Sequence, residues 1–116
     1  LEAARHKLMD ILCNYAGYRK CVPILVFDAY RVKGAGREQE TWHNLHVIYT
    51  REAETADMFI ERATHELAKN HRVRVVSSDG AEQIIILGNG ALRVSARAFE
   101  REVRAVEAEI REFLDQ

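Results

Sequence analysis

Two apolar segments that end in an aspartate constrain this chain more than any other feature of its sequence. Residues 22–28 read Val-Pro-Ile-Leu-Val-Phe-Asp, and residues 72–79 read Arg-Val-Arg-Val-Val-Ser-Ser-Asp. Apolar runs of this kind are typical of strands that are buried on both faces, as in a parallel sheet. Ligands of open α/β sheets bind beyond the carboxyl ends of such strands. We therefore expect Asp28 and Asp79 to lie at one edge of a sheet.

A third acid, Asp57, stands at the start of an amphipathic helical pattern. Apolar residues recur there at helical spacing, at Ala56, Phe59, Ile60, Ala63 and Leu67. Asp57 and Glu61 are four residues apart, so both carboxylates belong to one helix face. We expect Asp28, Asp57 and Asp79 to converge where a divalent cation and its phosphate-bearing substrate bind.

Each aspartate taken alone also fits a purely structural role. Asp28 suits a turn, Asp57 is favoured by the dipole at a helix start, and Asp79 suits a helix N-cap. Three carboxylates held close together repel one another unless a cation or protons offset their charge. Their expected convergence on one rim therefore favours a chemical role over three separate structural ones.

The remaining segments predict an α/β order in a single domain over residues 1–116. Residues 1–15 read as a helix that stops near Gly17, residues 31–43 as a polar loop, and residues 45–50 as a strand. The apolar run at 82–87 is too short to assign by period, but Asp79 as an N-cap favours a short helix. Residues 91–94 read as a brief extended piece. Thr50 or Thr55 can cap the helix of Asp57, and Ser95 can cap a long final helix.

Composition excludes several classes of protein. Apolar residues make up 47% of the 116 residues and charged residues 30%, which is ordinary for a globular domain. A formal charge of −1 gives no basis for binding nucleic acid by attraction to the whole domain. Cys13 and Cys21 form no CxxC motif, no signal-peptide pattern is visible, and no run approaches the roughly 20 apolar residues of a membrane span. We therefore expect a cytoplasmic protein.

Several strings of the sequence match one family pattern when they are taken together. They are residues 25–30 (LVFDAY), 47–50 (VIYT), 54–57 (ETAD), 75–79 (VVSSD), 82–83 (EQ) and 90–96 (GALRVSA). This series resembles the YacP-like NYN domain family, which belongs to the PIN-like nucleases. The resemblance implies a Rossmann-like parallel sheet flanked by helices. It also implies an acidic pocket that binds Mg²⁺ or Mn²⁺ and hydrolyses the phosphodiester bonds of single-stranded RNA.

The resemblance also assigns roles to particular residues. The acids that match the family's metal site are Asp28, Asp57 and Asp79, and the supporting acids are Glu54, Glu61 and Glu82. Cations near the mouth of such a site would contact the RNA backbone, and the candidates are Arg31, Lys33 and Arg37. Since the best-known bacterial member cleaves mRNA on the ribosome, mRNA and the ribosome are the expected partners.

The chain departs from the family pattern at its start. The family opens with a central strand that ends in Asp-Gly-Tyr-Asn, whereas this chain begins inside the helix that should follow it. We therefore interpret residues 1–116 as an N-terminally truncated NYN domain. Two strands next to the gap would be left with unpaired backbone groups, so we expect a homodimer, a strand-swapped oligomer, or a sheet that closes differently.

The absent acid of that first strand leaves more than one function open. The leading interpretation is a metal-dependent endoribonuclease. A catalytically inactive RNA- or ribosome-binding module is the alternative. A phosphate-binding signalling domain is a third class, although no lysine follows a late strand as that class requires.

Overall fold

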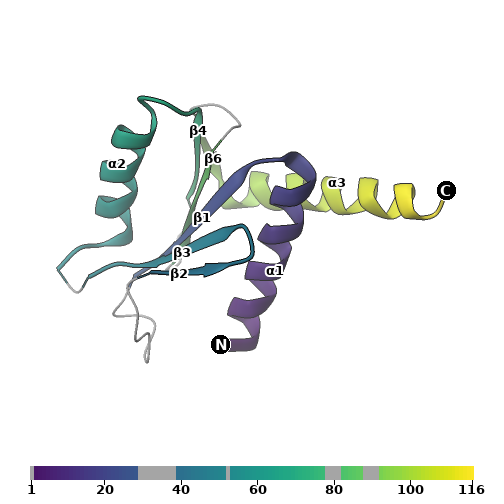
Figure 1. Ribbon diagram of the computed structural model, residues 1–116, viewed down its shortest axis with the longest axis horizontal. Coiled ribbons are helices and arrows are strands. Elements are labelled where there is room, and N and C mark those ends of the chain that lie inside the picture. Colours follow the sequence, from purple (N-terminus) through teal and green to yellow (C-terminus); the bar gives the residue numbers. More distant parts are fainter. Residues whose placement is uncertain (1, 29–38, 52, 78–81, 88–91) are drawn as a thin grey trace.

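The fold is a six-stranded sheet with helices on both faces (Figure 1). The computed structural model describes residues 2–28, 39–51, 53–77, 82–87 and 92–116. Helix α2 covers one face of the sheet, and α1 and α3 cover the other. The elements are α1 (Glu2–Arg19), β1 (Val22–Phe27), β2 (Gln39–Trp42), β3 (Leu45–Tyr49), α2 (Ala56–Leu67), β4 (Val73–Ser77), β5 (Glu82–Leu87), β6 (Leu92–Ser95) and α3 (Ala96–Leu114). None of these described helices is long and apolar enough to cross a bilayer.

The order of the strands in the sheet is β2-β3-β1-β5-β4-β6. Strand β1 is parallel to β3, and β4 is parallel to β6. Strand β5 lies between β1 and β4 and is antiparallel to both, so β1, β3, β4 and β6 all point the same way. The expected α/β class is thus confirmed, but the sheet is mixed and not purely parallel. The carboxyl ends of four strands still meet at one edge.

The two apolar runs of the sequence form strands that are buried on both faces. In β1, Leu25 packs into the cluster under α1 and α3, while the next residue, Val26, packs under α2. Both side chains are completely buried. Strand β4 divides in the same way, with Val76 on the α1/α3 side and Val75 on the α2 side. Adjacent residues of a strand point to opposite faces, so unbroken apolar sequence is what a covered sheet requires.

The segment 82–87 forms strand β5, so the expectation of a short helix there is wrong. Ile84, Ile85 and Ile86 are all buried, because β5 occupies the middle of the sheet with α2 on one face and the other helices on the opposite face. β-branched residues pack well in that environment. The sheet therefore closes with the chain's own strand between β1 and β4. That arrangement was one of the expected alternatives, and the homodimer or strand-swapped oligomer stays a prediction.

Two further expectations need correction. Residues 39–42, placed in a polar loop, form the edge strand β2, which is antiparallel to β3. Helix α1 does not stop at Gly17, whose Cα faces open space, but runs on to Arg19. It ends at Lys20, whose φ is 56°, and the Cys21 amide then donates to the Ala16 carbonyl at 3.1 Å. This is the Schellman arrangement, in which a residue in the left-handed region ends the helix.

An ion pair joins β4 to α3 on the face opposite α2. The guanidinium of Arg74 binds both carboxylate oxygens of Glu102, at 2.8 and 2.6 Å, and the Tyr15 hydroxyl donates to the same carboxylate at 3.4 Å. The side chains of Arg74 and Glu102 are only 14% and 29% exposed. The hydrogen bonds from Arg74 hold the pKa of Glu102 below its usual range.

We expect Glu102→Gln to lower the free energy of unfolding by about 2 kcal/mol near neutral pH, because it removes a charge-assisted pair. The pKa of Glu102 is lower in the folded state, so the stabilisation is present above about pH 4.3 and is lost as the pH falls through the folded-state pKa. Urea denaturation at several pH values should show that the two proteins differ less in their free energy of unfolding as the pH falls. Glu100→Gln, which breaks the exposed pair with Arg104, is the control and should change stability little.

The central position of β5 predicts slow hydrogen exchange. The amides of Ile84, Ile85 and Ile86 should exchange far more slowly than those of the edge strand β2, because β5 is paired on both sides and covered on both faces. Hydrogen–deuterium exchange followed by mass spectrometry measures this directly. Equal, rapid exchange of the two strands would contradict the assigned strand order.

Candidate functional site

The candidate site is the sheet edge at which β1, β3, β4 and β6 end. Asp28 follows β1, Thr50 follows β3, and Ser77 and Ser95 are the last residues of β4 and β6. Thr50 is only 3% exposed, and it ties the ends of β1 and β3 together. Its amide donates to the Phe27 carbonyl at 3.0 Å, and its hydroxyl lies 3.4 Å from the same oxygen. The ends of β1 and β3 are therefore held together by hydrogen bonds, and polar side chains lie next to them at this edge of the sheet.

Asp28 connects this edge to helix α2. Its Oδ1 accepts a hydrogen bond from the amide of Ala56, the first residue of α2, at 2.5 Å. The amide groups of the first helical turn have no partner inside the helix, and the helix dipole favours an anion there. Thr55 supplies the conventional N-cap by accepting from the Met58 amide at 3.1 Å. The half-buried Asp28 thus fixes where α2 begins.

The contact between Asp28 and α2 also brings a second acid to the edge. Asp57 is the residue after Ala56, so it lies in the first turn of the helix that Asp28 caps, and it is exposed. Two of the three aspartates expected to converge therefore lie at one place in the structure. Asp79, which follows β4 by two residues, lies outside the described residues.

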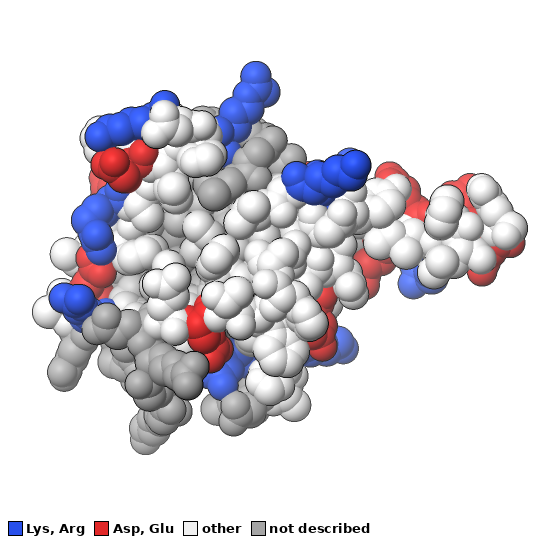
Figure 2. All heavy atoms as spheres, in the orientation of Figure 1, with Lys and Arg blue, Asp and Glu red and all other residues white. Residues whose placement is uncertain are grey.

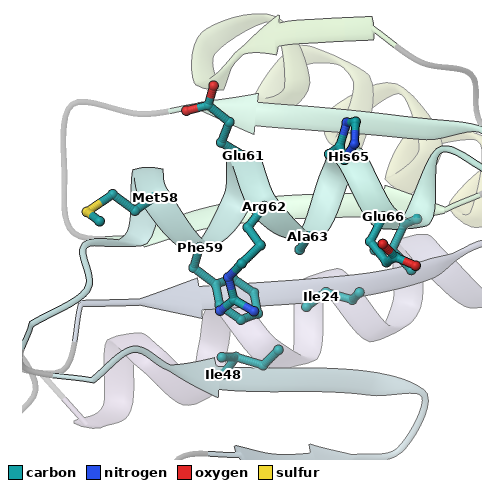
Figure 3. Close-up of a pocket in the computed structure, with 10 residues that line it drawn as sticks. Ile24, Ile48, Met58, Phe59, Glu61, Arg62, Ala63, His65 and Glu66 are labelled. Carbon is teal, nitrogen blue, oxygen red and sulfur yellow. The ribbon is translucent and has the colours of Figure 1, made fainter.

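The supporting acids occupy different surroundings. Glu54 is half-buried in the turn before α2, and both of its carboxylate oxygens bind Nη2 of Arg62, at 2.9 and 3.2 Å. Glu61 is exposed on α2, one turn after Asp57, and its side chain points away from β1 and β3 (Figure 3). The backbone of Glu82 opens β5 in register with Phe27, the neighbour of Asp28. Arg31, Lys33 and Arg37 lie outside the described residues.

The described acids have the right chemistry for a hard divalent cation. Mg²⁺ binds oxygen ligands and is often held by only one or two carboxylates, with water completing its shell. Asp28 and Asp57 supply such oxygens, although one oxygen of Asp28 already accepts the Ala56 amide. Within the part of the chain that the structure describes, no three acidic, histidine or cysteine side chains are grouped closely enough to hold a metal ion.

One cation at this edge was not picked out by the sequence reasoning. Arg93 of β6 donates from Nη1 to the hydroxyl of Ser77, at the end of β4, over 2.6 Å. Arg93 lies apart from the other arginines near the C-terminus, at positions 97, 101 and 104, which belong to α3. Arg104 pairs with Glu100 on α3, whereas Arg93 belongs to the sheet. The signal was its place in a short extended segment ahead of the Ser95 cap.

The charged surface of the domain is mixed in sign. In the view of Figure 2, Lys, Arg, Asp and Glu side chains are scattered around the margin of an otherwise uncharged face. This agrees with the formal charge of −1. On this face the described residues form no broad basic patch, so contact with RNA there would come from particular side chains.

A helix-flanked α/β sheet with acids where its parallel strands end is consistent with the PIN-like class of nuclease domains. The sequence profile of the YacP-like NYN domain matches residues 1–116, so the chain belongs to that family. Membership in this family makes it a nuclease-like, RNA-related domain.

One curated relative is the uncharacterized protein YacP of Bacillus subtilis (strain 168), which is 43% identical over 110 residues. The alignment covers 94% of this chain but only 64% of YacP. No solved structure matches the chain significantly.

Asp28 follows β1 and also accepts a hydrogen bond from the first residue of α2. Two substitutions of Asp28 should therefore change the stability of the protein by different amounts. Asp28→Asn keeps an oxygen that can accept from Ala56, so the free energy of unfolding should stay within about 0.5 kcal/mol of wild type. Asp28→Ala removes the acceptor and should cost about 1–2 kcal/mol. Urea denaturation measures both. If Asn proves as costly as Ala, the negative charge and not the hydrogen bond holds α2 in place.

Proposed function

We propose that this domain is a metal-dependent endoribonuclease that cleaves single-stranded RNA, with mRNA on the ribosome as the natural substrate. The observation that supports this most is the hydrogen bond from the Ala56 amide to Asp28, because it brings Asp28 and Asp57 to the carboxyl edge of the sheet. Membership in a nuclease-like family supports the reaction class. The proposed metal ligands are Asp28, Asp57 and Asp79.

Each group at the edge has a role in this proposal. Bound Mg²⁺ or Mn²⁺ would polarise the phosphate and lower the pKa of an attacking water. Asp57 is exposed in the first turn of α2, and Asp28 has a second carboxylate oxygen besides the one that accepts from the Ala56 amide. Glu54, Glu61 and Glu82 would orient water around the reacting phosphate. Arg31, Lys33 and Arg37 would position the RNA backbone.

A second candidate function is an RNA- or ribosome-binding module without catalysis. The observation in its favour is that Arg51 and Arg62, which are exposed beside the carboxyl edge, can contact RNA without a metal. The two candidates differ in what a metal does. A nuclease loses its chemistry without the cation, whereas a binding module keeps its affinity for RNA.

The decisive assay incubates the protein with end-labelled single-stranded RNA and Mn²⁺, with and without EDTA, and with and without purified ribosomes. Cleavage should disappear in EDTA. Asp57→Asn should reduce the rate on the order of 100-fold or more, because a lost metal ligand removes several kcal/mol of transition-state stabilisation. Asp115→Asn makes the same chemical change at an exposed residue near the end of α3 and should leave the rate unchanged.

Three results would count against the nuclease. Cleavage that persists in EDTA would exclude a metal-dependent mechanism. Cleavage that is equally fast in Asp57→Asn and Asp115→Asn would place the reaction elsewhere. Stable binding of RNA without cleavage, whether or not ribosomes are present, would favour the binding module.

A further inference from the structure

A groove runs between α2 and the strands β1 and β3. Its volume is about 1020 Å³, and we call it the α2–β3 groove. Its lining residues are Ile24, Ile48, Met58, Phe59, Glu61, Arg62, Ala63, His65, Glu66 and Leu67. In Figure 3 the side chains of Phe59 and Arg62 hang from α2 over the strands, above Ile24 and Ile48. Ile24 and Ile48 therefore form an apolar floor, and the ring of Phe59 and the guanidinium of Arg62 form part of one wall.

The groove exists because α2 is the only described helix on its face of the sheet. Its buried side packs on Val26 of β1, on β4 and on Ile85 of β5. Ile48 of β3 lies outside that cluster and is only half-buried. The surface beside α2 is thus left open, and Met58, which lines the groove, is 55% exposed.

The groove continues into the candidate site. A neighbouring hollow of about 650 Å³ shares Ile48, Met58, Phe59 and Arg62 with it and reaches the carboxyl edge of the sheet. There the lining includes Thr50, Arg51 and Glu54. If the scissile phosphate of an RNA strand is bound at the acidic edge, the neighbouring nucleotides would lie in this groove.

In the wall of the groove, the guanidinium of Arg62 lies over the ring of Phe59, and we call this pair the Phe59–Arg62 surface. The guanidinium carbon of Arg62 lies 5.3 Å from the centroid of the Phe59 ring, and Nη2 of the same guanidinium donates to both carboxylate oxygens of Glu54. RNA bases that are not paired stack on aromatic rings and on guanidinium planes. Such stacking is tolerant of sequence because every base has a π face.

We propose that the α2–β3 groove binds single-stranded RNA next to the cleaved bond, with one base stacked on the Phe59–Arg62 surface. This inference rests on the proposed ribonuclease function and names the path of its substrate. A base can stack on Arg62 while the ion pair with Glu54 stays intact. A protein helix laid along the same floor would have to bury that ion pair, which is costly. The groove therefore favours RNA over a peptide.

The charges along the groove predict how this binding responds to salt. Arg51 and Arg62 are the exposed arginines in the two linings, and Glu54, Glu61 and Glu66 lie among them. Few phosphates can be neutralised in such surroundings, so affinity must come mainly from stacking. The logarithm of the binding constant should then fall only shallowly with the logarithm of the salt concentration. A duplex of the same sequence should bind poorly, because its bases are already stacked.

The test measures binding without cleavage, by fluorescence anisotropy of a labelled single-stranded oligoribonucleotide in EDTA. Phe59→Leu keeps apolar volume but removes the ring, and it should weaken binding about tenfold or more. Phe59→Tyr should restore binding to near the wild-type level. Phe113→Leu makes the same chemical change at an exposed residue of α3, outside the groove, and should leave the affinity within about twofold of wild type.

A second measurement serves if Phe59→Leu does not fold. Phe59→Trp places a fluorophore at the stacking position, and the wild-type protein, whose single tryptophan is Trp42, provides the background signal. RNA should quench the added fluorescence and leave the wild-type signal unchanged. Absence of quenching at saturating RNA would overturn the proposal.

The outcomes separate this inference from the proposed function. If Phe59→Leu binds RNA as tightly as wild type while cleavage depends on Asp57, the proposed RNA binding in the groove is refuted and the proposed nuclease function stands. Ring-dependent binding without any cleavage would support the groove and refute the nuclease. Equal affinity for single strands and duplexes would also refute stacking in the groove, because it would indicate binding through the phosphate backbone that both forms expose.

Discussion

The hydrogen bond between the Ala56 amide and the Asp28 carboxylate is the contact on which the rest of the candidate site depends. Apolar side chains pack α2 on the sheet, but apolar contacts are not directional, so they alone would allow the helix to shift along the sheet. The bond to Asp28 is directional, and it fixes the first residue of α2 to the end of β1. The placement of Asp57 and Glu54, and the width of the α2–β3 groove, all follow from where that helix starts.

Most of the fold could be predicted from local patterns in the sequence. Apolar runs identified β1 and β4, helical spacing identified α2, and Thr55 and Ser95 cap the helices as expected. Segments without a local signal could not be assigned in this way. Strand β5 is defined by the space between β1 and β4 and not by its own short run of isoleucines. Strand β2 has a polar sequence and forms only because β3 offers it a backbone partner.

The candidate site was harder to derive than the fold. The sequence could indicate that Asp28 follows a strand and that Asp57 lies at the start of a helix, because both elements have a recognisable pattern. It could not show that the carboxylate of Asp28 reaches the amide next to Asp57 across 28 residues of chain. The pairings of Arg93 with Ser77 and of Arg62 with Glu54 leave no periodic trace either. Contacts of this kind are set by the tertiary arrangement, which a linear pattern does not contain.

The same contacts explain how acids can gather at one edge while the domain stays folded. A cluster of carboxylates costs free energy unless positive charge offsets it. Here the N-terminus of α2 offsets part of the charge of Asp28, and Arg62 neutralises Glu54. These groups belong to the fold itself. The described part of the edge therefore has positive groups of its own beside Asp28 and Glu54, so we expect the free energy of unfolding to depend little on a bound cation.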